Sequence, residues 1–173
     1  VLSHKNEKSI KNFTAYVSMA PKIGFWSPQL NLGIQKQWLT LNTSMGSCRL
    51  NRPVVMGNFN NALTLPWGLM LNVDFAFQGK GNATNYKLTK NQYVLNAGLR
   101  KSFLGDELTV ELNGNDLLYQ QWDGGILYNP KMQIEQVNRY KTRSVSITLR
   151  YKFNTAKSKY KGTGAGTSER QRL

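Results

Sequence analysis

A ten-residue stretch near the end of the chain alternates apolar and polar residues without a break. In SVSITLRYKF, residues 144–153, Val, Ile, Leu, Tyr and Phe alternate with Ser, Ser, Thr, Arg and Lys. Successive side chains of a β-strand point to opposite faces, so this pattern predicts a strand with one apolar and one polar face. About ten residues are also what a tilted strand needs to cross a bilayer. A strand of a soluble sheet would alternate in the same way, so this stretch alone does not decide between them.

Six further segments alternate similarly. Together with the last stretch they predict seven long strands, at 13–25, 30–38, 54–65, 69–78, 91–104, 107–115 and 144–153. Short turns follow residues 25, 65 and 104, whereas long loops occupy 42–53, 79–90 and 116–138; parts of the last are expected to continue the flanking strands. Short turns on one side and long loops on the other are typical of a transmembrane β-barrel wall. A soluble sandwich has no reason to segregate its connections in this way.

The first two turns predict hairpins whose apolar residues share one face. Trp26-Ser27-Pro28-Gln29 predicts a turn that pairs Phe25 with Leu30 and Ile23 with Leu32. Pro66-Trp67-Gly68 predicts a turn with Gly68 in a left-handed conformation, and it pairs Leu65 with Leu69, Leu63 with Leu71 and Phe59 with Phe75.

The third turn, Gly105-Asp106, has the glycine first, as a type II′ hairpin prefers. Its register pairs Phe103 with Leu108 and Leu99 with Leu112. It also sets Arg100 opposite Glu111 on the polar face, which predicts an ion pair between the two strands.

This register assigns candidate residues to each side of the barrel wall. Asp74, Arg100, Glu111 and Arg150 are expected to face the lumen. Leu71, Phe75, Leu112, Ile147 and Leu149 are expected to face lipid. Trp26, Trp67 and Phe103 gather at the short-turn end, where an interfacial aromatic girdle would lie, and Phe153 ends the barrel-closing strand.

The chain is strongly basic, with 23 Lys and Arg against nine Asp and Glu and a net charge of +14. Five of the cations and one of the acids lie in 154–173, which leaves +10 for residues 1–153. Eight cations fall at the long-loop end: Arg49, Arg52, Lys80, Lys87, Lys90, Lys131, Arg139 and Lys141. There they could meet phosphate-bearing lipid headgroups, although solvated loop charge is the simpler interpretation. The alternative class is a soluble basic β-domain that binds nucleic acid or glycan.

Three regions are expected along the chain. Residues 1–10 form a loop lead-in, 11–153 a barrel segment, and 154–173 a disordered basic tail. Because seven strands is an odd number, the segment is interpreted as the C-terminal part of a larger barrel, which would not fold alone.

No pattern of catalytic or metal-binding residues emerges. His4 is the one histidine and lies in a polar lead-in, and Cys48 is the one cysteine, so the chain cannot form an internal disulfide. Asp74 and Glu111 are interpreted as structural carboxylates rather than a catalytic pair. The expectation is therefore a protein that is not an enzyme, with no metal and no cofactor. Its ligand-binding residues are not identified by the sequence.

Several short segments resemble a known family. They are PKIGFW at 21–26, GIQKQW at 33–38, KSFL at 101–104, NDLL at 115–118, Arg143 at the start of the last strand and YKFN at 151–154. Together they resemble the C-terminal barrel of TonB-dependent receptors and the related outer-membrane β-barrel family.

The resemblance implies a 22-strand barrel in the bacterial outer membrane that takes up a ligand, of unknown identity, past an N-terminal plug. Its implied partners are outer-membrane lipid, the missing plug and barrel strands, TonB and the barrel-assembly machinery; nucleic acid is not expected. A passive pore or an adhesin built on the same barrel stays open as an alternative.

Overall fold

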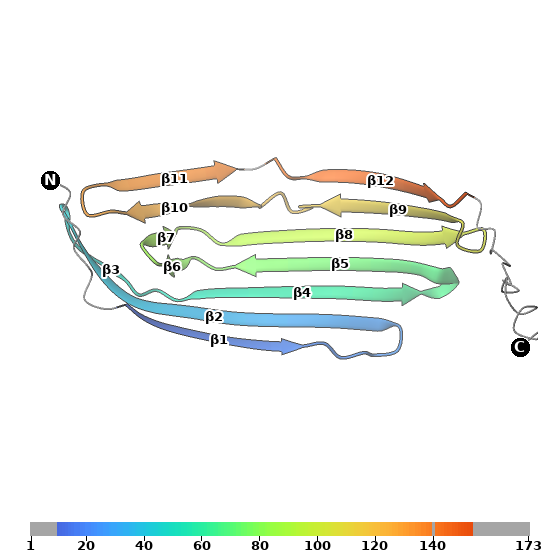
Figure 1. Ribbon diagram of the computed structural model, residues 1–173, viewed down its shortest axis with the longest axis horizontal. Helices are drawn as coiled ribbons and strands as arrows, with labels where there is room; N and C mark the ends of the chain where they lie inside the picture. Colours follow the sequence, from blue (N-terminus) through green and yellow to red (C-terminus); the bar gives the residue numbers. More distant parts are fainter. Residues whose placement is uncertain (1–9, 140, 154–173) are drawn as a thin grey trace, which may run out of the picture.

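The computed structural model describes residues 10–139 and 141–153, and its regular structure is antiparallel β-sheet (Figure 1). Within these residues, the one helical element is a 3-10 turn at Pro66–Gly68. No described helix is long and apolar enough to cross a membrane. The expected disordered tail at 154–173, and all but the last residue of the expected lead-in, lie outside the described residues.

Seven long strands form the principal sheet, in the order β1-β2-β4-β5-β8-β9-β12. They are β1 (Lys11–Met19), β2 (Trp26–Thr43), β4 (Val54–Leu65), β5 (Leu69–Gln78), β8 (Gln92–Phe103), β9 (Leu108–Asn115) and β12 (Ser144–Tyr151). Each long strand lies beside the next long strand in sequence, which confirms the antiparallel up-and-down arrangement of an all-β barrel segment. The outermost strands β1 and β12 each pair on one side only among the described residues.

The strand registers separate the side chains into two continuous faces. Directly opposite residues of paired strands point to the same side of a sheet, so the faces can be followed from strand to strand. The apolar face includes Val17, Leu32, Ile34, Phe59, Leu71, Phe75, Leu95, Leu99, Leu112, Ile147 and Leu149. The polar face includes Asn31, Asn58, Asn60, Asp74, Asn96, Arg100, Glu111, Thr148 and Arg150. The predicted pairings of the second and third hairpins are confirmed.

The apolar face is not covered by any other part of the described chain. Ile147 and Leu149 are each 69% exposed, and Val17, Leu32 and Leu112 are also exposed. The buried hydrophobic side chains among the described residues are instead Leu39, Leu50, Val54 and Leu88, which gather at the long-loop end. A continuous apolar surface of this extent is unfavourable in water and suits contact with lipid hydrocarbon.

The first hairpin differs from its predicted register. Met19 pairs with Leu30 and Val17 with Leu32, so the chain turns at residues 20–25 and the predicted turn around Pro28 belongs to β2. The shift is an even number of residues, so each apolar side chain keeps its face. Pro28 is tolerated because the β1 ladder ends at Leu30, so no β1 carbonyl requires the N–H that proline lacks.

The three predicted long loops contain further strands. β3 (Gly46–Leu50) pairs with the extended end of β2, and β6 (Gly81–Ala83) pairs with β7 (Tyr86–Leu88). β10 (Trp122–Tyr128) and β11 (Gln133–Arg139) form a hairpin in line with β9 and β12 (Figure 1). The expectation that part of 116–138 continues the flanking strands is therefore confirmed, whereas the segments predicted as loops at 42–53 and 79–90 contain short strands that were not predicted.

The tight turns hold residues at positive φ. Gly68 has φ +68°, as predicted, and Trp67 before it has φ +63°. In the third turn both Gly105 and Asp106 have positive φ, of +62° and +71°. A type II′ turn requires positive φ at its first central residue only, so this turn is closer to type I′ than to the predicted II′.

The last strand ends earlier than predicted. β12 ends at Tyr151 rather than Phe153, although the Lys152 N–H still donates to the Glu107 carbonyl at 2.9 Å. Phe153 is 83% exposed, and its ring meets that of Tyr151 edge-on with centroids 4.7 Å apart.

Candidate functional site

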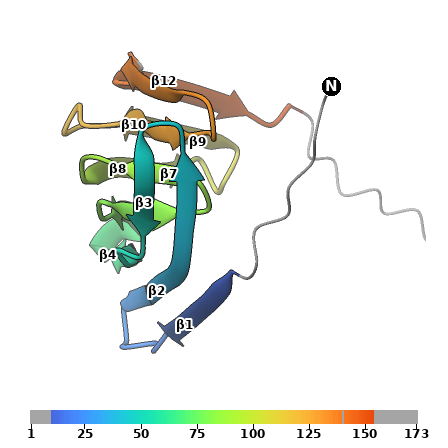
Figure 2. The ribbon, with the colours of Figure 1, turned by 90° about the vertical axis from the view of Figure 1, so that its left-hand side faces the viewer.

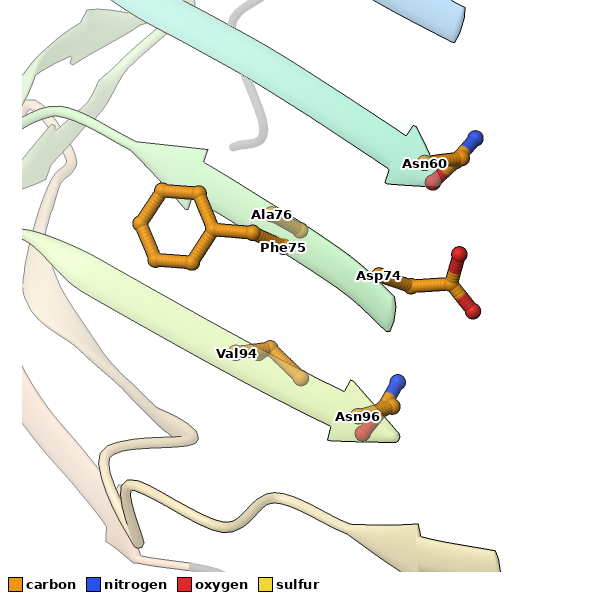
Figure 3. Close-up of a pocket in the computed structure, with 6 residues that line it drawn as sticks. All are labelled: Asn60, Asp74, Phe75, Ala76, Val94 and Asn96. Atoms are coloured by element: carbon orange, nitrogen blue, oxygen red, sulfur yellow. The ribbon is translucent and has the colours of Figure 1, made fainter. Parts of the chain in front are cut away.

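A row of polar side chains crosses four adjacent strands of the polar face. Gln29 of β2 lies opposite Asn60 of β4, Asn60 opposite Asp74 of β5, and Asp74 opposite Asn96 of β8. Figure 3 shows Asn60, Asp74 and Asn96 projecting to the same side of their strands, with the ring of Phe75 directed away. The alternation of β5 places a carboxylate among carboxamides on one side and an aromatic ring on the other.

The polar row borders an open depression of about 370 Å³, lined by Asn60, Asp74, Phe75, Ala76, Val94 and Asn96. Asn96 is engaged through its Oδ1, which accepts a hydrogen bond of 2.9 Å from the Asp116 N–H. The Asp74 carboxylate is exposed and makes no hydrogen bond to another described residue. Asp74 is therefore free to accept hydrogen bonds from a solute that passes this face.

The structure places all four predicted lumen-facing residues on the polar face. Arg100 lies opposite Met70 and Glu111, and Arg150 lies opposite Thr109. The five predicted lipid-facing residues, Leu71, Phe75, Leu112, Ile147 and Leu149, all lie on the apolar face. The assignment of these two faces to lumen and lipid stays a prediction.

The expected ion pair between Arg100 and Glu111 does not form, although the two residues are directly opposite. Among the described residues, Glu111 is instead bonded to Asn113, whose Nδ2 donates to Glu111 Oε1 at 2.7 Å. Asn113 lies two residues along the same strand, so its side chain projects from the same face, beside the Glu111 carboxylate.

The three predicted interfacial aromatics lie at the end of the sheet that carries the short turns. Trp67 occupies the β4–β5 turn and is 85% exposed. Phe103 ends β8, with Lys101 Nζ 5.0 Å from its ring centroid. Trp26 was expected in a turn but begins β2, where its indole Nε1 donates to Asn61 Oδ1 at 3.1 Å. Their role at a membrane interface stays a prediction.

At the other end of the sheet, three hairpins form one connected layer that we call the loop-end cap. It contains β3, β6, β7, β10, β11 and residues 37–43 of β2. Gln37, which is 2% exposed, holds the β6–β7 turn: its Nε2 donates to the Thr84 carbonyl, and its Oε1 accepts from the Thr84 N–H, both at 2.6 Å. Asn82 bonds twice to the backbone of Arg52: its side-chain Oδ1 accepts from the Arg52 N–H at 2.9 Å, and its backbone N–H donates to the Arg52 carbonyl at 3.0 Å.

The β2–β3 hairpin crosses the loop end and reaches the β10–β11 hairpin (Figure 2). The Ser44 N–H donates to the Pro130 carbonyl at 2.7 Å, and Ser44 Oγ contacts the Lys131 carbonyl at 3.4 Å. Burial and the neighbouring Cys48 thiol raise the pKa of the Tyr128 phenol above its ordinary value. A small depression of about 150 Å³ lies between the two hairpin tips.

Asp116 connects the principal sheet to the cap. It is 1% exposed, and its Oδ2 accepts from Thr142 Oγ1 at 2.7 Å while its Oδ1 accepts from the Gln120 N–H at 3.1 Å. Nearby, Arg143 Nη2 donates to the Leu117 carbonyl at 2.8 Å. These bonds order the crossing from β9 to β10 and the entry into β12.

Sequence reasoning missed the buried polar residues of the cap. Gln37 lies on the polar side of an alternating strand, so the pattern predicts exposure and gives no sign of burial. Asp116 carried a weak signal, because an Asp directly after a strand often bonds to nearby backbone.

Among the described residues, no group of three His, Cys, Asp or Glu side chains could hold a metal ion. Arg49, Arg52, Lys80, Lys87, Lys90, Lys131 and Arg139 lie in or beside the cap.

Comparison with known proteins agrees with this arrangement. A family model described as an outer membrane protein beta-barrel family matches residues 4–151. Searches of curated proteins and of solved structures gave no match. The match spans the whole principal sheet, and the alternative of a soluble basic β-domain is therefore wrong. The chain belongs to the outer membrane protein beta-barrel family and is a β-barrel protein of the bacterial outer membrane.

Proposed function

We propose that this chain forms part of the barrel of a TonB-dependent receptor that takes up a solute through its polar interior. The observation that carries the proposal is the polar face: across β4, β5 and β8 it is mainly polar, with Asn58, Asn60, Asp74, Asn96 and Arg100 on it and Met56, Met70, Ala76 and Val94 between them. Single-chain barrels place long loops outside the cell and short turns in the periplasm, so a solute would meet the cap first.

The charges divide into a basic entrance and a balanced wall. The charged polar-face residues of the described long strands are two cations, Arg100 and Arg150, and two anions, Asp74 and Glu111. The excess of cations lies at the loop end, where a one-sign field would steer anionic solutes towards the entrance. Within the wall, hydrogen bonds to carboxamides and to Asp74 would then guide the solute.

The plug, the TonB contact and the energy supply belong to the proposal by resemblance, as does the larger barrel of which this chain would be a C-terminal part. No catalytic step is proposed. The competing proposals are a passive pore and an adhesin on the same barrel.

Two measurements on the full-length protein separate these functions. A plugged receptor should show no steady conductance in a planar bilayer with KCl on both sides, and it should bind the purified C-terminal domain of TonB. Steady conductance without TonB binding would replace uptake by passive permeation. Absence of both conductance and TonB binding would favour an adhesin.

A further inference from the structure

The apolar face carries three charged side chains in the described strands of the principal sheet, and all three are lysines: Lys11, Lys36 and Lys101. No carboxylate of these strands shares that face. A cation that faces lipid is costly near the membrane midplane but is tolerated near the interface. The two lysines that lie together, Lys11 and Lys36, therefore mark a site near one edge of the apolar face.

Lys11 and Lys36 form a compact group with two aromatic residues, which we call the rim quartet. Lys11 of β1 lies directly opposite Trp38 of β2, and Phe13 lies directly opposite Lys36. Lys36 Nζ is 4.9 Å from the centroid of the Trp38 ring. Phe13 and Trp38 are exposed on the same face. Each lysine thus has an aromatic neighbour both across the strand pair and along its own strand.

The rim quartet lies at the loop end of the apolar face, because β2 continues from it directly into the loop-end cap. With the long loops outside the cell, this edge meets the outer leaflet. Long lysine side chains can lay their stems along apolar surface and carry the ammonium to the headgroup level. Two cations at that level, with no carboxylate of the described strands on their face, favour an anionic partner.

We propose that the rim quartet binds the phosphate group of an outer-leaflet lipid. The Lys11 and Lys36 ammonium groups contact the phosphate oxygens, and the Phe13 and Trp38 rings pack at the boundary between headgroup and acyl chains. Charge complementarity selects a phosphorylated lipid over a neutral one. The proposal does not depend on uptake, since a pore or an adhesin would carry the same outer surface.

The chain offers a matched control in Lys101 and Phe103. Lys101 Nζ lies 5.0 Å from the Phe103 ring centroid, almost the same geometry as in the Lys36–Trp38 pair. This pair lies at the turn end, however, and Lys101 has Leu69 and Val110 as its cross-strand neighbours instead of a second cation. Loss of Lys101 should therefore leave phosphate-lipid binding unchanged.

The test is a lipid titration of the full-length protein, extracted from the outer membrane and delipidated in a non-ionic detergent. The probe is diphosphoryl lipid A, with bound lipid counted by native mass spectrometry. K11Q/K36Q should bind about 25-fold more weakly than wild type, on the order of fivefold per lysine. K101Q should bind within about twofold of wild type. The shift of each variant's band on boiling reports whether its barrel has assembled.

Further arms identify the source of the phosphate and protect against failed assembly. Dephosphorylated lipid A should bind wild type and K11Q/K36Q equally, and millimolar inorganic phosphate should not displace the lipid. If K11Q/K36Q does not assemble, K11R/K36R should assemble and keep wild-type affinity because it keeps both charges. Wild-type binding by an assembled K11Q/K36Q, an equal loss in K101Q, displacement by inorganic phosphate, or loss of binding in an assembled K11R/K36R would each overturn the proposal.

Discussion

The two ends of the same strands are stabilised in different ways. In the principal sheet, apolar side chains such as Ile147 stand exposed, and the described contacts that hold the strands are mainly backbone ladders. In the loop-end cap, Leu50 is 1% exposed and belongs to a small hydrophobic core like that of a soluble protein. The difference is what two solvents would require: the cap completes its own core, whereas the exposed apolar face of the sheet is expected to be completed by lipid.

Polar residues show the same contrast. Gln35 and Gln37 lie on the same face of β2, but Gln37 is buried with two hydrogen bonds to Thr84 whereas Gln35 is only half-buried. The boundary between wall and cap therefore falls within a single strand. Substitutions on either side of that boundary should have effects of different kind and size.

The largest expected effect is at the apolar face. Phe75→Arg places a charge against lipid near the midplane, which should cost roughly 2–4 kcal/mol and block assembly. Asn72→Arg, three residues away on the polar face, should assemble normally. The measurement is the fraction of full-length protein whose gel mobility shifts on boiling. Equal tolerance of both substitutions would contradict the assignment of the faces.

The next effect is expected where wall and cap join. Asp116→Ala removes the acceptor for Thr142 Oγ1 and for the Gln120 N–H, which should destabilise the junction by about 2–3 kcal/mol. Limited proteolysis should then cut residues 117–121 faster while the barrel still shifts on boiling. Asp116→Asn keeps an acceptor oxygen and should lose less. If Asp116→Ala were as resistant to proteolysis as wild type, the bonds of Asp116 would not stabilise the junction between the sheet and the cap.

A smaller effect is expected inside the cap. Gln37→Leu removes both bonds to Thr84 and should weaken the β6–β7 hairpin by about 1–3 kcal/mol. The amide of Thr84 should exchange roughly 10–100-fold faster in hydrogen-exchange experiments. Gln35→Leu, on the same strand and face, serves as the control and should leave that amide protected. Equal acceleration in both variants would mean that general loosening of β2, rather than loss of the two Gln37–Thr84 hydrogen bonds, sets the exchange rate.

Alternation predicted which side each residue occupies better than it predicted where the strands turn. Ile23 and Phe25 continue the parity of β1, so they extended the expected strand through what is in fact the turn at 20–25. A slip by an even number of residues leaves every face unchanged, and hydrophobic pattern alone cannot detect it. The hairpins around Pro66-Trp67-Gly68 and Gly105-Asp106 were predicted in register because turn residues fix the pairing there.

The cap was beyond sequence reasoning for a different reason. β6 and β7 contain three residues each, too few to show a period, and they are stabilised by contacts with distant segments. Gln37 and Thr84 are 47 positions apart, and Ser44 and Lys131 are 87 apart. The local sequence of an Asn- and Gly-rich segment such as 79–90 does not indicate such distant partners, so it predicts a loop. The polar row around Asp74 was partly accessible, because its parity was correct although the depression was not foreseen.

The smallest structural effect, and the most direct comparison of the two faces, comes from neighbouring residues. In a Cys48→Ser background, Asp74→Cys should change the free energy of unfolding by no more than about 0.5 kcal/mol, since Asp74 is exposed and makes no bond to a described residue. A water-soluble maleimide should label it readily in intact membranes if the polar face lines an aqueous interior. Phe75→Cys, adjacent in sequence and on the apolar face, should react at least tenfold more slowly, because a maleimide requires the thiolate and lipid suppresses thiol ionisation.

Each result of this labelling has a distinct meaning. Faster labelling of Phe75→Cys would reverse the assignment of the two faces to lipid and water. Equal labelling would mean that water reaches both faces and that the apolar surface is covered in some other way. Selective labelling of Asp74→Cys would place the depression on the aqueous side. Protection of that cysteine by an added solute would then identify the solute by its binding rather than by growth or uptake, which makes Asp74 the position from which the unknown ligand can be sought.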